Sequence, residues 1–185
     1  HKLGIIGLGK IGSLVALKMK YFKMDVGFYD PYVKNGYEKV IGINRFNTLE
    51  ELKANSSIIS INASLTKETK KMINNTFIET LNEGTILINT ARGAIIDNLK
   101  ILIDGLKSNK LSGVGLDVLP EEPPNDDDDF FRVWRDNRND LSERIIINPH
   151  AGYYSIKSLI EMRTKASSNL LNFLNSKKIM NEIKY

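Results

Sequence analysis

The sequence predicts an α/β protein with a doubly wound parallel sheet in a single domain of 185 residues. Short apolar segments alternate with segments of helical periodicity, as in sheets whose strands are covered by helices on both faces. Residues 3–6 are the first expected strand. Gly7, Gly9 and Gly12 follow it with G-x-G-x-x-G spacing, and residues 13–24 are an unbroken helix-forming run. A strand, a glycine turn and a helix in this order are typical of the Rossmann fold.

Each glycine of this motif has its own expected role in binding a dinucleotide. Gly7 allows the tight turn, Gly9 lets the backbone approach a pyrophosphate, and Gly12 lets helix and strand pack closely. The anion would lie at the N-terminus of the helix, where free N–H groups and the helix dipole favour negative charge. Residues 26–29 are the second expected strand, and Asp30 ends it. Asp30 follows the motif at close to the ~20-residue spacing expected for the carboxylate that binds the adenosine ribose.

The remaining elements continue the alternation. Thr48 is the expected N-cap of a short helix, with Glu51 placed as in a capping box. Asp97 is expected to cap another helix, and Gly113 and Gly115 allow a later strand to pack closely. Residues 31–42 are rich in turn-forming residues. The further strands are expected at residues 43–46, 57–61, 85–89, 114–118 and 145–148, and the further helices at residues 48–53, 75–81, 97–107 and 155–174.

One stretch between two of these elements differs from the rest. Residues 125–143 are polar and charged, with four consecutive aspartates at 126–129, and we expect a partly mobile surface loop there. Phe130, Phe131 and Trp134 are unusual in such a loop. Two interpretations stay open: these aromatic residues dock back on the domain, or they cover part of a partner's surface.

Composition limits the classes of function. The chain has no cysteine, which excludes disulfides, thiolate metal sites and cysteine nucleophiles and is compatible with a cytoplasmic location. The net charge is +4, but acidic and basic residues are mixed along the chain, so direct binding of nucleic acid is not expected. No apolar run approaches the ~20 residues of a membrane span, so we expect no membrane contact. A metal site is not expected either.

Several polar residues follow expected strands, at the edge where parallel sheets bind ligands. His150 follows the last strand and has the chemistry of a proton donor, although a surface or capping histidine is the alternative. Arg92 follows strand 85–89 and is able to grip a carboxylate with two hydrogen bonds; a surface ion pair is the alternative. Asp117 lies at the end of strand 114–118 and Glu122 follows it. A carboxylate here is a candidate partner for His150, and a solvated acidic loop is the alternative.

Together these stretches resemble the NAD-binding domain of the D-isomer-specific 2-hydroxyacid dehydrogenases, over nearly the whole chain. The matching stretches are residues 4–12, 28–31, 88–93, 115–118 with Glu122-Pro123, and Pro149-His150. Within this family, residues 29–32 and 150–155 are most similar to the C-terminal binding proteins, which are NAD-sensing transcriptional corepressors. Phosphoglycerate dehydrogenases and glyoxylate or hydroxypyruvate reductases are other similar branches.

The resemblance implies the following roles, with NAD as the cofactor. Arg92 would bind the carboxylate and carbonyl of a 2-keto acid, and His150, paired with Glu122, would donate a proton as hydride arrives from the nicotinamide. Asp30 would bind the adenosine ribose and disfavour the 2′-phosphate of NADP. Arg92 and His150 would also contact the cofactor. The other residues implied to do so are Gly7, Gly9, Lys10, Ile11, Gly12, Ala63, Ser64, Thr66, Thr69, Thr90, Ala91, Asp117 and Tyr153.

The chain also departs from the family's pattern. Where the family often has His-x-Pro-Leu-Thr after the fourth strand, residues 62–66 are Asn-Ala-Ser-Leu-Thr, without the proline that stiffens this cofactor-side loop. In the family a second domain supplies much of the substrate site. We therefore expect residues 1–185 to be the NAD-binding domain of a longer protein, a fragment that does not catalyse by itself.

Two further expectations follow from the resemblance. The first is a homodimer formed largely by the nucleotide domains, with the apolar side of helix 155–174 and the aromatic residues of 125–143 as candidate surfaces. The second is the choice of function. An NAD-dependent dehydrogenase acting on a 2-hydroxy or 2-keto acid in the cytoplasm is favoured by Arg92, Glu122 and His150, and a corepressor-like NAD-sensing scaffold in the nucleus is the alternative.

Overall fold

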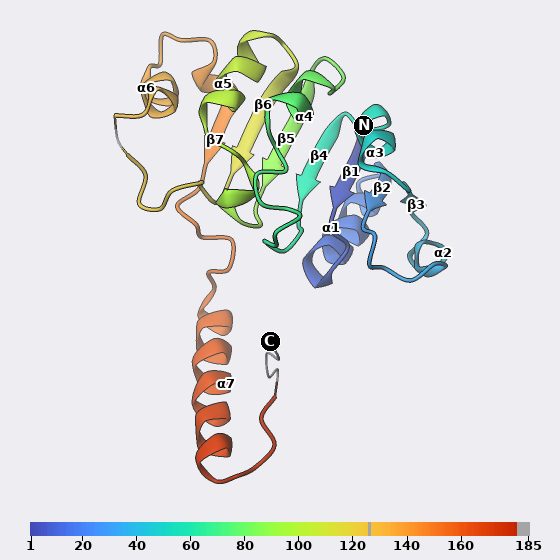
Figure 1. Cartoon of the computed structure of the whole chain (residues 1–185), viewed down its shortest axis with the longest axis vertical. Coiled ribbons are helices and arrows are strands. Elements are labelled where there is room, and N and C mark those ends of the chain that lie inside the picture. Colours follow the sequence, from blue (N-terminus) through green and yellow to red (C-terminus); the bar gives the residue numbers. More distant parts are fainter. Residues whose placement is uncertain (126, 181–185) are drawn as a thin grey trace. The chain divides into compact units, whose positions relative to one another are not determined.

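Seven strands, all paired in parallel, form one sheet in the order β3-β2-β1-β4-β5-β6-β7 (Figure 1). The computed structural model describes residues 1–125 and 127–180. The strand order reverses between β1 and β4, which is where open parallel sheets bind ligands. The strands are β1 (Lys2–Ile6), β2 (Asp25–Tyr29), β3 (Asn44–Arg45), β4 (Ile58–Ile61), β5 (Thr85–Asn89), β6 (Leu111–Leu116) and β7 (Ile145–Ile147).

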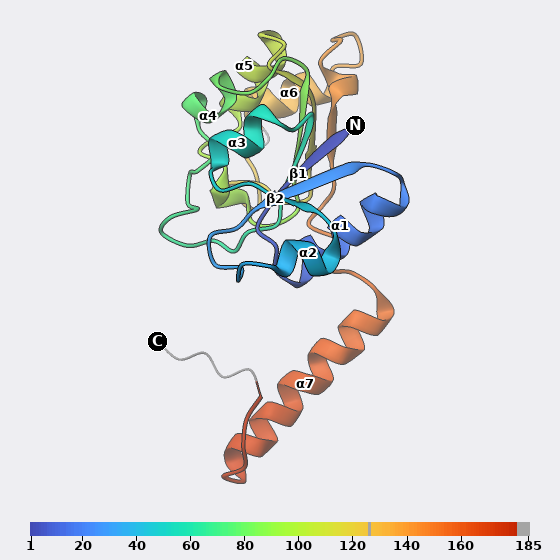
Figure 2. The ribbon, with the colours of Figure 1, turned by 90° about the vertical axis from the view of Figure 1, so that its right-hand side faces the viewer.

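The chain divides into two compact units, His1–Pro149 and His150–Tyr185. Among its described residues the first unit holds the sheet, six α-helices and two short 3₁₀ helices, Gly93–Ile95 and Ser142–Arg144. The second unit holds the long helix α7 (Ile156–Leu174). In the first unit α1 lies on one face of the sheet and α3, α4 and α5 lie on the other (Figure 2). The helices of the first unit are α1 (Lys10–Tyr21), α2 (Tyr37–Ile41), α3 (Leu49–Ala54), α4 (Asn75–Glu79), α5 (Lys100–Lys107) and α6 (Asp129–Arg135).

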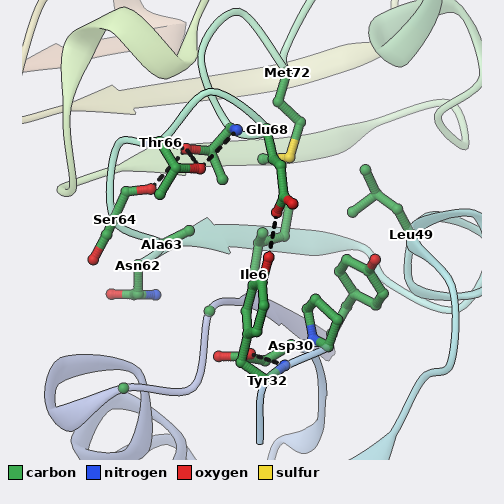
Figure 3. Close-up of a pocket in the computed structure, with 15 residues that line it drawn as sticks. Ile6, Asp30, Tyr32, Leu49, Asn62, Ala63, Ser64, Thr66, Glu68 and Met72 are labelled. Atoms are coloured by element: carbon green, nitrogen blue, oxygen red, sulfur yellow. Dashed lines mark hydrogen bonds between the residues drawn. The ribbon is translucent and has the colours of Figure 1, made fainter. Parts of the chain in front are cut away.

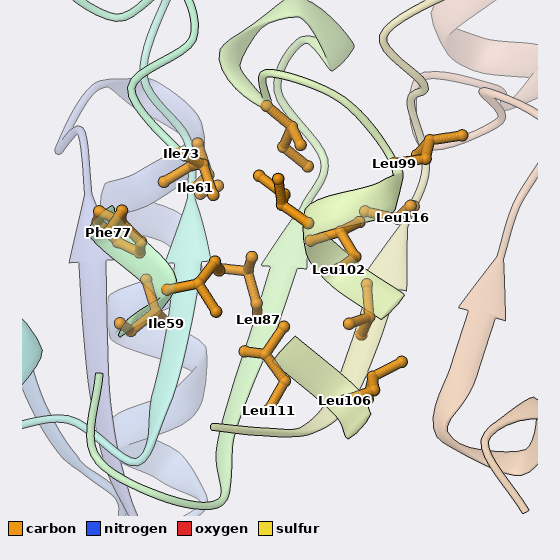
Figure 4. Close-up of a cluster of buried hydrophobic side chains, with 14 of the residues drawn as sticks. Ile59, Ile61, Ile73, Phe77, Leu87, Leu99, Leu102, Leu106, Leu111 and Leu116 are labelled. Carbon is orange, nitrogen blue, oxygen red and sulfur yellow. The ribbon is translucent and has the colours of Figure 1, made fainter. Parts of the chain in front are cut away.

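The two faces of the sheet carry separate apolar clusters. Leu3 and Ile5 of β1 are buried in the cluster under α1, whereas Ile6 belongs to the cluster on the other face. This alternation follows from the two-residue period of a strand. The larger cluster, between the sheet and helices α3 to α6, includes Leu87 of β5 and Leu102 of α5, neither of which is exposed (Figure 4). Both faces are therefore covered by helices, and the predicted doubly wound α/β fold is confirmed.

The predicted cap of α3 is confirmed in its main feature. The Oγ1 atom of Thr48 accepts the N–H of Glu51 at 3.1 Å. The carboxylate of Glu51 accepts the N–H of Asn47 at 2.7 Å, one residue before the N–H that a capping box would use. Two backbone groups at the start of the helix are thus satisfied by side chains.

The predicted start of α5 is wrong. Asp97 does not cap the helix: its N–H donates to the carbonyl of Ile73 at 2.9 Å, and its carboxylate pairs with Lys71 at 2.8 Å. The backbone is still extended at this point, because the preceding residue Ile96 forms a parallel bridge with Ile73. The helix begins at Lys100 instead. Tertiary pairing thus prevails over a local capping preference.

Residues 125–143 are not a simple surface loop. They contain α6, whose N-cap Asp128 accepts the N–H of Phe130 at 2.8 Å. Phe130 and Phe131 are buried in the larger cluster, and Trp134 packs against it half-buried. Of the two interpretations, docking back on the domain is the one that the structure supports, because aromatic rings release much apolar surface from water on burial. The first aspartate of the run 126–129 lies outside the described residues.

Removal of the Phe130 ring tests how α6 is held. Phe130→Ala is expected to lower the free energy of unfolding by about 3–5 kcal/mol, because it leaves a cavity in the larger cluster. The matched control is Phe22→Ala, whose ring is 75% exposed and whose effect should stay within about 1 kcal/mol. Urea unfolding measures the free energy of unfolding of both variants. Small and equal losses of stability would contradict the packing of Phe130 in the larger cluster.

Candidate functional site

Two hollows follow one another along the carboxyl ends of the central strands. The first has a volume of about 420 Å³ and the second about 350 Å³. They share one wall, made by Asn62, Ala63 and Ser64 after β4. Together they lie at the reversal of strand order between β1 and β4. Of the residues expected to contact a cofactor, Gly7, Gly9, Asp30, Ala63, Ser64, Thr66 and Thr69 line the first hollow, and Ile11, Ala63, Ser64, Thr90, Ala91 and Arg92 line the second.

The turn after β1 makes one wall of the first hollow (Figure 3). Gly7 has a φ of +89°, and a Cβ there would lie 2.6 Å from the Cα of Ala63. A Cβ at Gly12 would lie 2.1 Å from the carbonyl oxygen of Gly7, so only glycine lets α1 start this close to the turn. At Gly9 a Cβ would meet no atom within 4 Å, so the space beside this backbone is open to a ligand.

Asp30 joins two loops of this hollow. One carboxylate oxygen accepts the N–H of Leu8 in the glycine turn at 2.8 Å, and the other accepts the N–H of Tyr32 at 2.9 Å. Each carboxylate oxygen has a further lone pair. Asp30 is therefore fixed in place and still able to accept hydrogen bonds from ribose hydroxyls.

Arg45 is a residue that the sequence analysis missed. From β3, its guanidinium donates to the main-chain carbonyls of Asp30, Val33 and Lys34 at 2.9–3.4 Å, and it pairs with Glu38 at 3.1 Å. Backbone hydrogen bonding and the Arg45 guanidinium hold the pKa of Glu38 below its usual range. This network fixes the loop that follows Asp30. No sequence motif indicates it, because most of its acceptors are main-chain carbonyls.

The wall shared by the two hollows holds a polar group that the sequence analysis also missed. The Nδ2 atom of Asn62 donates to the Oγ of Ser60 at 3.0 Å. The Oδ1 atom of Asn62 is buried and has no hydrogen-bond partner among the described residues. Buried acceptors are rarely left unpaired, so this atom fits a site that is completed by a ligand with hydroxyl groups.

The loop after Asn62 keeps a defined shape without the family's proline. Oγ1 of Thr69 accepts the N–H of Thr66 at 2.8 Å and donates to the carbonyl of Ser64 at 2.7 Å. Hydroxyl groups that bond to nearby backbone often stabilise such turns. The threonines at 66 and 69 therefore support the loop as well as lining the first hollow.

In the second hollow, the turn that carries Arg92 is built around Asn89. This residue is fully buried at the end of β5; its Oδ1 accepts the N–H of Ala91 and its Nδ2 donates to the carbonyl of Arg92, both at 3.0 Å. Next to it, a Cβ at Gly93 would lie 1.7 Å from the carbonyl oxygen of Leu119. The backbone of residues 90–92 is thus held from both sides. The sequence analysis missed this role of Asn89; an asparagine at the end of an apolar strand is the signal that could have indicated it.

The remaining expected site residues lie outside these two hollows. Lys10 and Gly12 are at the start of α1. Asp117 is buried after β6 and lines a separate hollow of about 440 Å³, and Glu122 accepts the N–H of Leu119 at 2.8 Å. His150 and Tyr153 belong to the second unit, where their rings meet edge to face with centroids 6.1 Å apart.

The described part of the chain holds neither a candidate metal site nor a membrane-spanning helix. Residues 1–125 and 127–180 contain no group of three or more histidine, aspartate or glutamate side chains arranged to hold a metal ion. No helix within these ranges has the length and apolar character needed to cross a membrane.

The parallel sheet, the glycine turn and the carboxylate after β2 define a Rossmann domain of the NAD-binding class. The chain belongs to the D-isomer specific 2-hydroxyacid dehydrogenases: residues 1–152 match the NAD binding domain of this family. The resemblance inferred from the sequence is therefore confirmed.

Its relatives include enzymes with several substrates. The chain is 34% identical to D-3-phosphoglycerate dehydrogenase of Bacillus subtilis over 98% of its own length and 32% of that protein. It is 33% identical to glyoxylate reductase of Korarchaeum cryptofilum over 92% of its own length and 48% of that protein. The structure of D-lactate dehydrogenase from Aquifex aeolicus, complexed with NAD and lactic acid, matches with a TM-score of 0.81 and 34% identity, over 95% of this chain and 54% of that one. The chain spans about half of these relatives or less.

The close approach at Gly12 gives a stability test of the glycine turn. Gly12→Ala is expected to cost about 1–3 kcal/mol in the free energy of unfolding, because its Cβ would overlap the Gly7 carbonyl. Gly113→Ala is the matched control; its Cβ would be 3.6 Å from the nearest atom, so it should be near neutral. Thermal unfolding compares the two variants, and equal stabilities would show that Gly12 does not approach the Gly7 carbonyl this closely.

Proposed function

We propose that the chain binds NAD(H) along the two hollows, and that the protein to which it belongs is an NAD-dependent D-2-hydroxyacid dehydrogenase. The observation that carries the proposal is the pair of hollows that share one wall, with Asp30 in the first and Arg92 in the second. The pyrophosphate would lie beside Gly9 at the N-terminus of α1, where no atom would obstruct it. The nicotinamide would then occupy the second hollow, beside Thr90 and Ala91.

The catalytic roles in this proposal follow the family's pattern. NADH would supply a hydride to the carbonyl carbon of a 2-keto acid. Arg92 would hold the substrate carboxylate and stabilise the charge that develops on the carbonyl oxygen. His150 would donate a proton to that oxygen, and Glu122 would orient the imidazole. The structure supports the role of Arg92 through the turn that Asn89 fixes at the end of β5.

The alternative function is an NAD-sensing scaffold of the corepressor type, acting in the nucleus instead of the cytoplasm. It rests on the likeness of residues 29–32 and 150–155 to the C-terminal binding proteins. A homodimer is proposed for either function. Exposed apolar side chains of α7, such as Leu170 and Phe173, are candidate contacts, whereas Phe130 and Phe131 are not, because they are buried within their own unit. Light scattering of the intact protein decides the oligomeric state.

The preference between cofactors tests the role of Asp30. NADH should bind about tenfold or more tightly than NADPH, because a 2′-phosphate would lie against the Asp30 carboxylate. Asp30→Asn should lower the ratio of NADH affinity to NADPH affinity, since the amide removes the charge and keeps an acceptor for the N–H of Leu8. Asp25→Asn, at the opposite end of β2, is the matched control and should leave the ratio unchanged. Calorimetry with both cofactors measures the two affinities. Tighter binding of NADPH by the unaltered chain would refute the assignment of Asp30 as the ribose contact.

Turnover by the intact protein tests the catalytic roles. His150→Ala is expected to slow reduction of 2-keto acids by roughly 10²–10⁴-fold while NADH affinity changes little, the usual effect of losing a positioned acid. Arg92→Ala should raise KM and lower kcat together, because it would contact both substrate and transition state. Steady-state kinetics with a panel of 2-keto acids is the measurement. An intact protein that binds NADH tightly and reduces none of them would favour the scaffold.

A further inference from the structure

A hydrogen bond spans the first hollow between its two walls. The phenol of Tyr32 donates to Oε2 of Glu68 at 2.5 Å. Tyr32 lies in the loop after β2 and Glu68 in the loop after β4, and both line the hollow (Figure 3). Neither residue belongs to the glycine motif or to the catalytic set. Their contact requires an explanation, because it joins two exposed side chains that are far apart in the sequence.

Both ends of this hydrogen bond are held by their own loops. The N–H of Tyr32 is bound to Asp30, so the base of the phenol ring is tied to the carboxylate expected to bind the ribose. Glu68 lies inside the turn that the Thr66 and Thr69 hydroxyls close. The pair is therefore positioned before any ligand arrives, and Tyr32 lies two residues after Asp30, the expected ribose contact.

The rest of this part of the hollow suits a flat, largely apolar group. Ile6, Leu49 and Met72 line it together with Pro31 and the pair. Among the described residues that line the hollow there are two carboxylates and no lysine or arginine. The purine base that follows the ribose of a dinucleotide has this shape, and it carries no negative charge.

The Tyr32–Glu68 pair presents acceptors to that base. The single O–H of Tyr32 is used by Glu68, and a carboxylate has no donor of its own. The same hydrogen bond raises the pKa of Tyr32, so the phenol stays protonated. The lone pairs of the phenolic oxygen and of Glu68 Oε1 are what remain for a ligand.

We propose that Tyr32 and Glu68 recognise the base of the dinucleotide and select an amino group at position 6, as in adenine, against a carbonyl, as in hypoxanthine. The inference rests on the proposed binding of NAD(H). The amino group of adenine donates hydrogen bonds to acceptors of this kind. Hypoxanthine places its carbonyl oxygen against the carboxylate, and its one ring N–H is able to satisfy only one of the two acceptors.

The experiment compares NADH with reduced nicotinamide hypoxanthine dinucleotide, which differs only in the purine. Binding of each is measured by calorimetry on the unaltered chain, and NADH should bind roughly tenfold more tightly, the range of a hydrogen bond to a charged group. In Glu68→Ala the ratio should fall to about one. In Glu68→Gln the amide is able to donate to the carbonyl, so the hypoxanthine dinucleotide should gain affinity relative to the unaltered chain.

Two further variants separate recognition from general effects. Glu83→Ala removes an exposed carboxylate that does not line the hollow and should keep the tenfold ratio. Tyr32→Phe removes one of the two acceptors and leaves the carboxylate in place, so the ratio should fall but stay above one; an unchanged ratio would remove Tyr32 from the recognition. Circular dichroism confirms that each variant is folded.

The outcomes distinguish this inference from the proposed function. Equal affinity of the unaltered chain for the two dinucleotides, or an unchanged ratio in both Glu68 variants, overturns base recognition and leaves NAD binding intact. Failure of the folded, unaltered chain to bind either dinucleotide refutes NAD binding, and base recognition with it.

Discussion

The hydrogen bond between the Leu8 N–H and the Asp30 carboxylate is the interaction on which the first hollow depends. It joins the turn after β1 to the end of β2, so that two neighbouring strands present their loops as one surface. The same carboxylate binds the N–H of Tyr32, whose phenol reaches Glu68 on the far wall. A continuous series of hydrogen bonds therefore connects the glycine turn to the loop after β4.

The second hollow uses the same principle with different groups. Loops at the ends of parallel strands have no sheet partners for their own backbone, so side chains must satisfy it. Asn89 does this for the turn that carries Arg92, and Thr69 does it for the loop after Asn62. Because these loops are held by internal hydrogen bonds, the proposed cofactor would meet a largely preformed surface. Such preorganisation reduces the entropy cost of binding.

The sequence predicted the sheet well because each strand has a local signal. A short apolar run such as residues 57–61 or 85–89 is buried on both faces in a parallel sheet, so its composition alone identifies it. The site glycines and Asp30 were found because their spacing follows from the geometry of one strand-turn-helix unit. The short helices α2 and α6 were missed, since five to seven residues give too little periodicity to be distinguished from a loop.

The sequence by itself determined the class of fold, the family and the approximate ends of most strands, because these depend on patterns between residues close in the chain. Tertiary structure decided the burial of Phe130, the extended backbone at Asp97, and the contacts of Arg45 and Glu68. In each case the packing or hydrogen-bonding partner is distant in the sequence, or it is a main-chain group that every residue type carries. These partners come together only when the parallel strands bring their loops to one edge of the sheet.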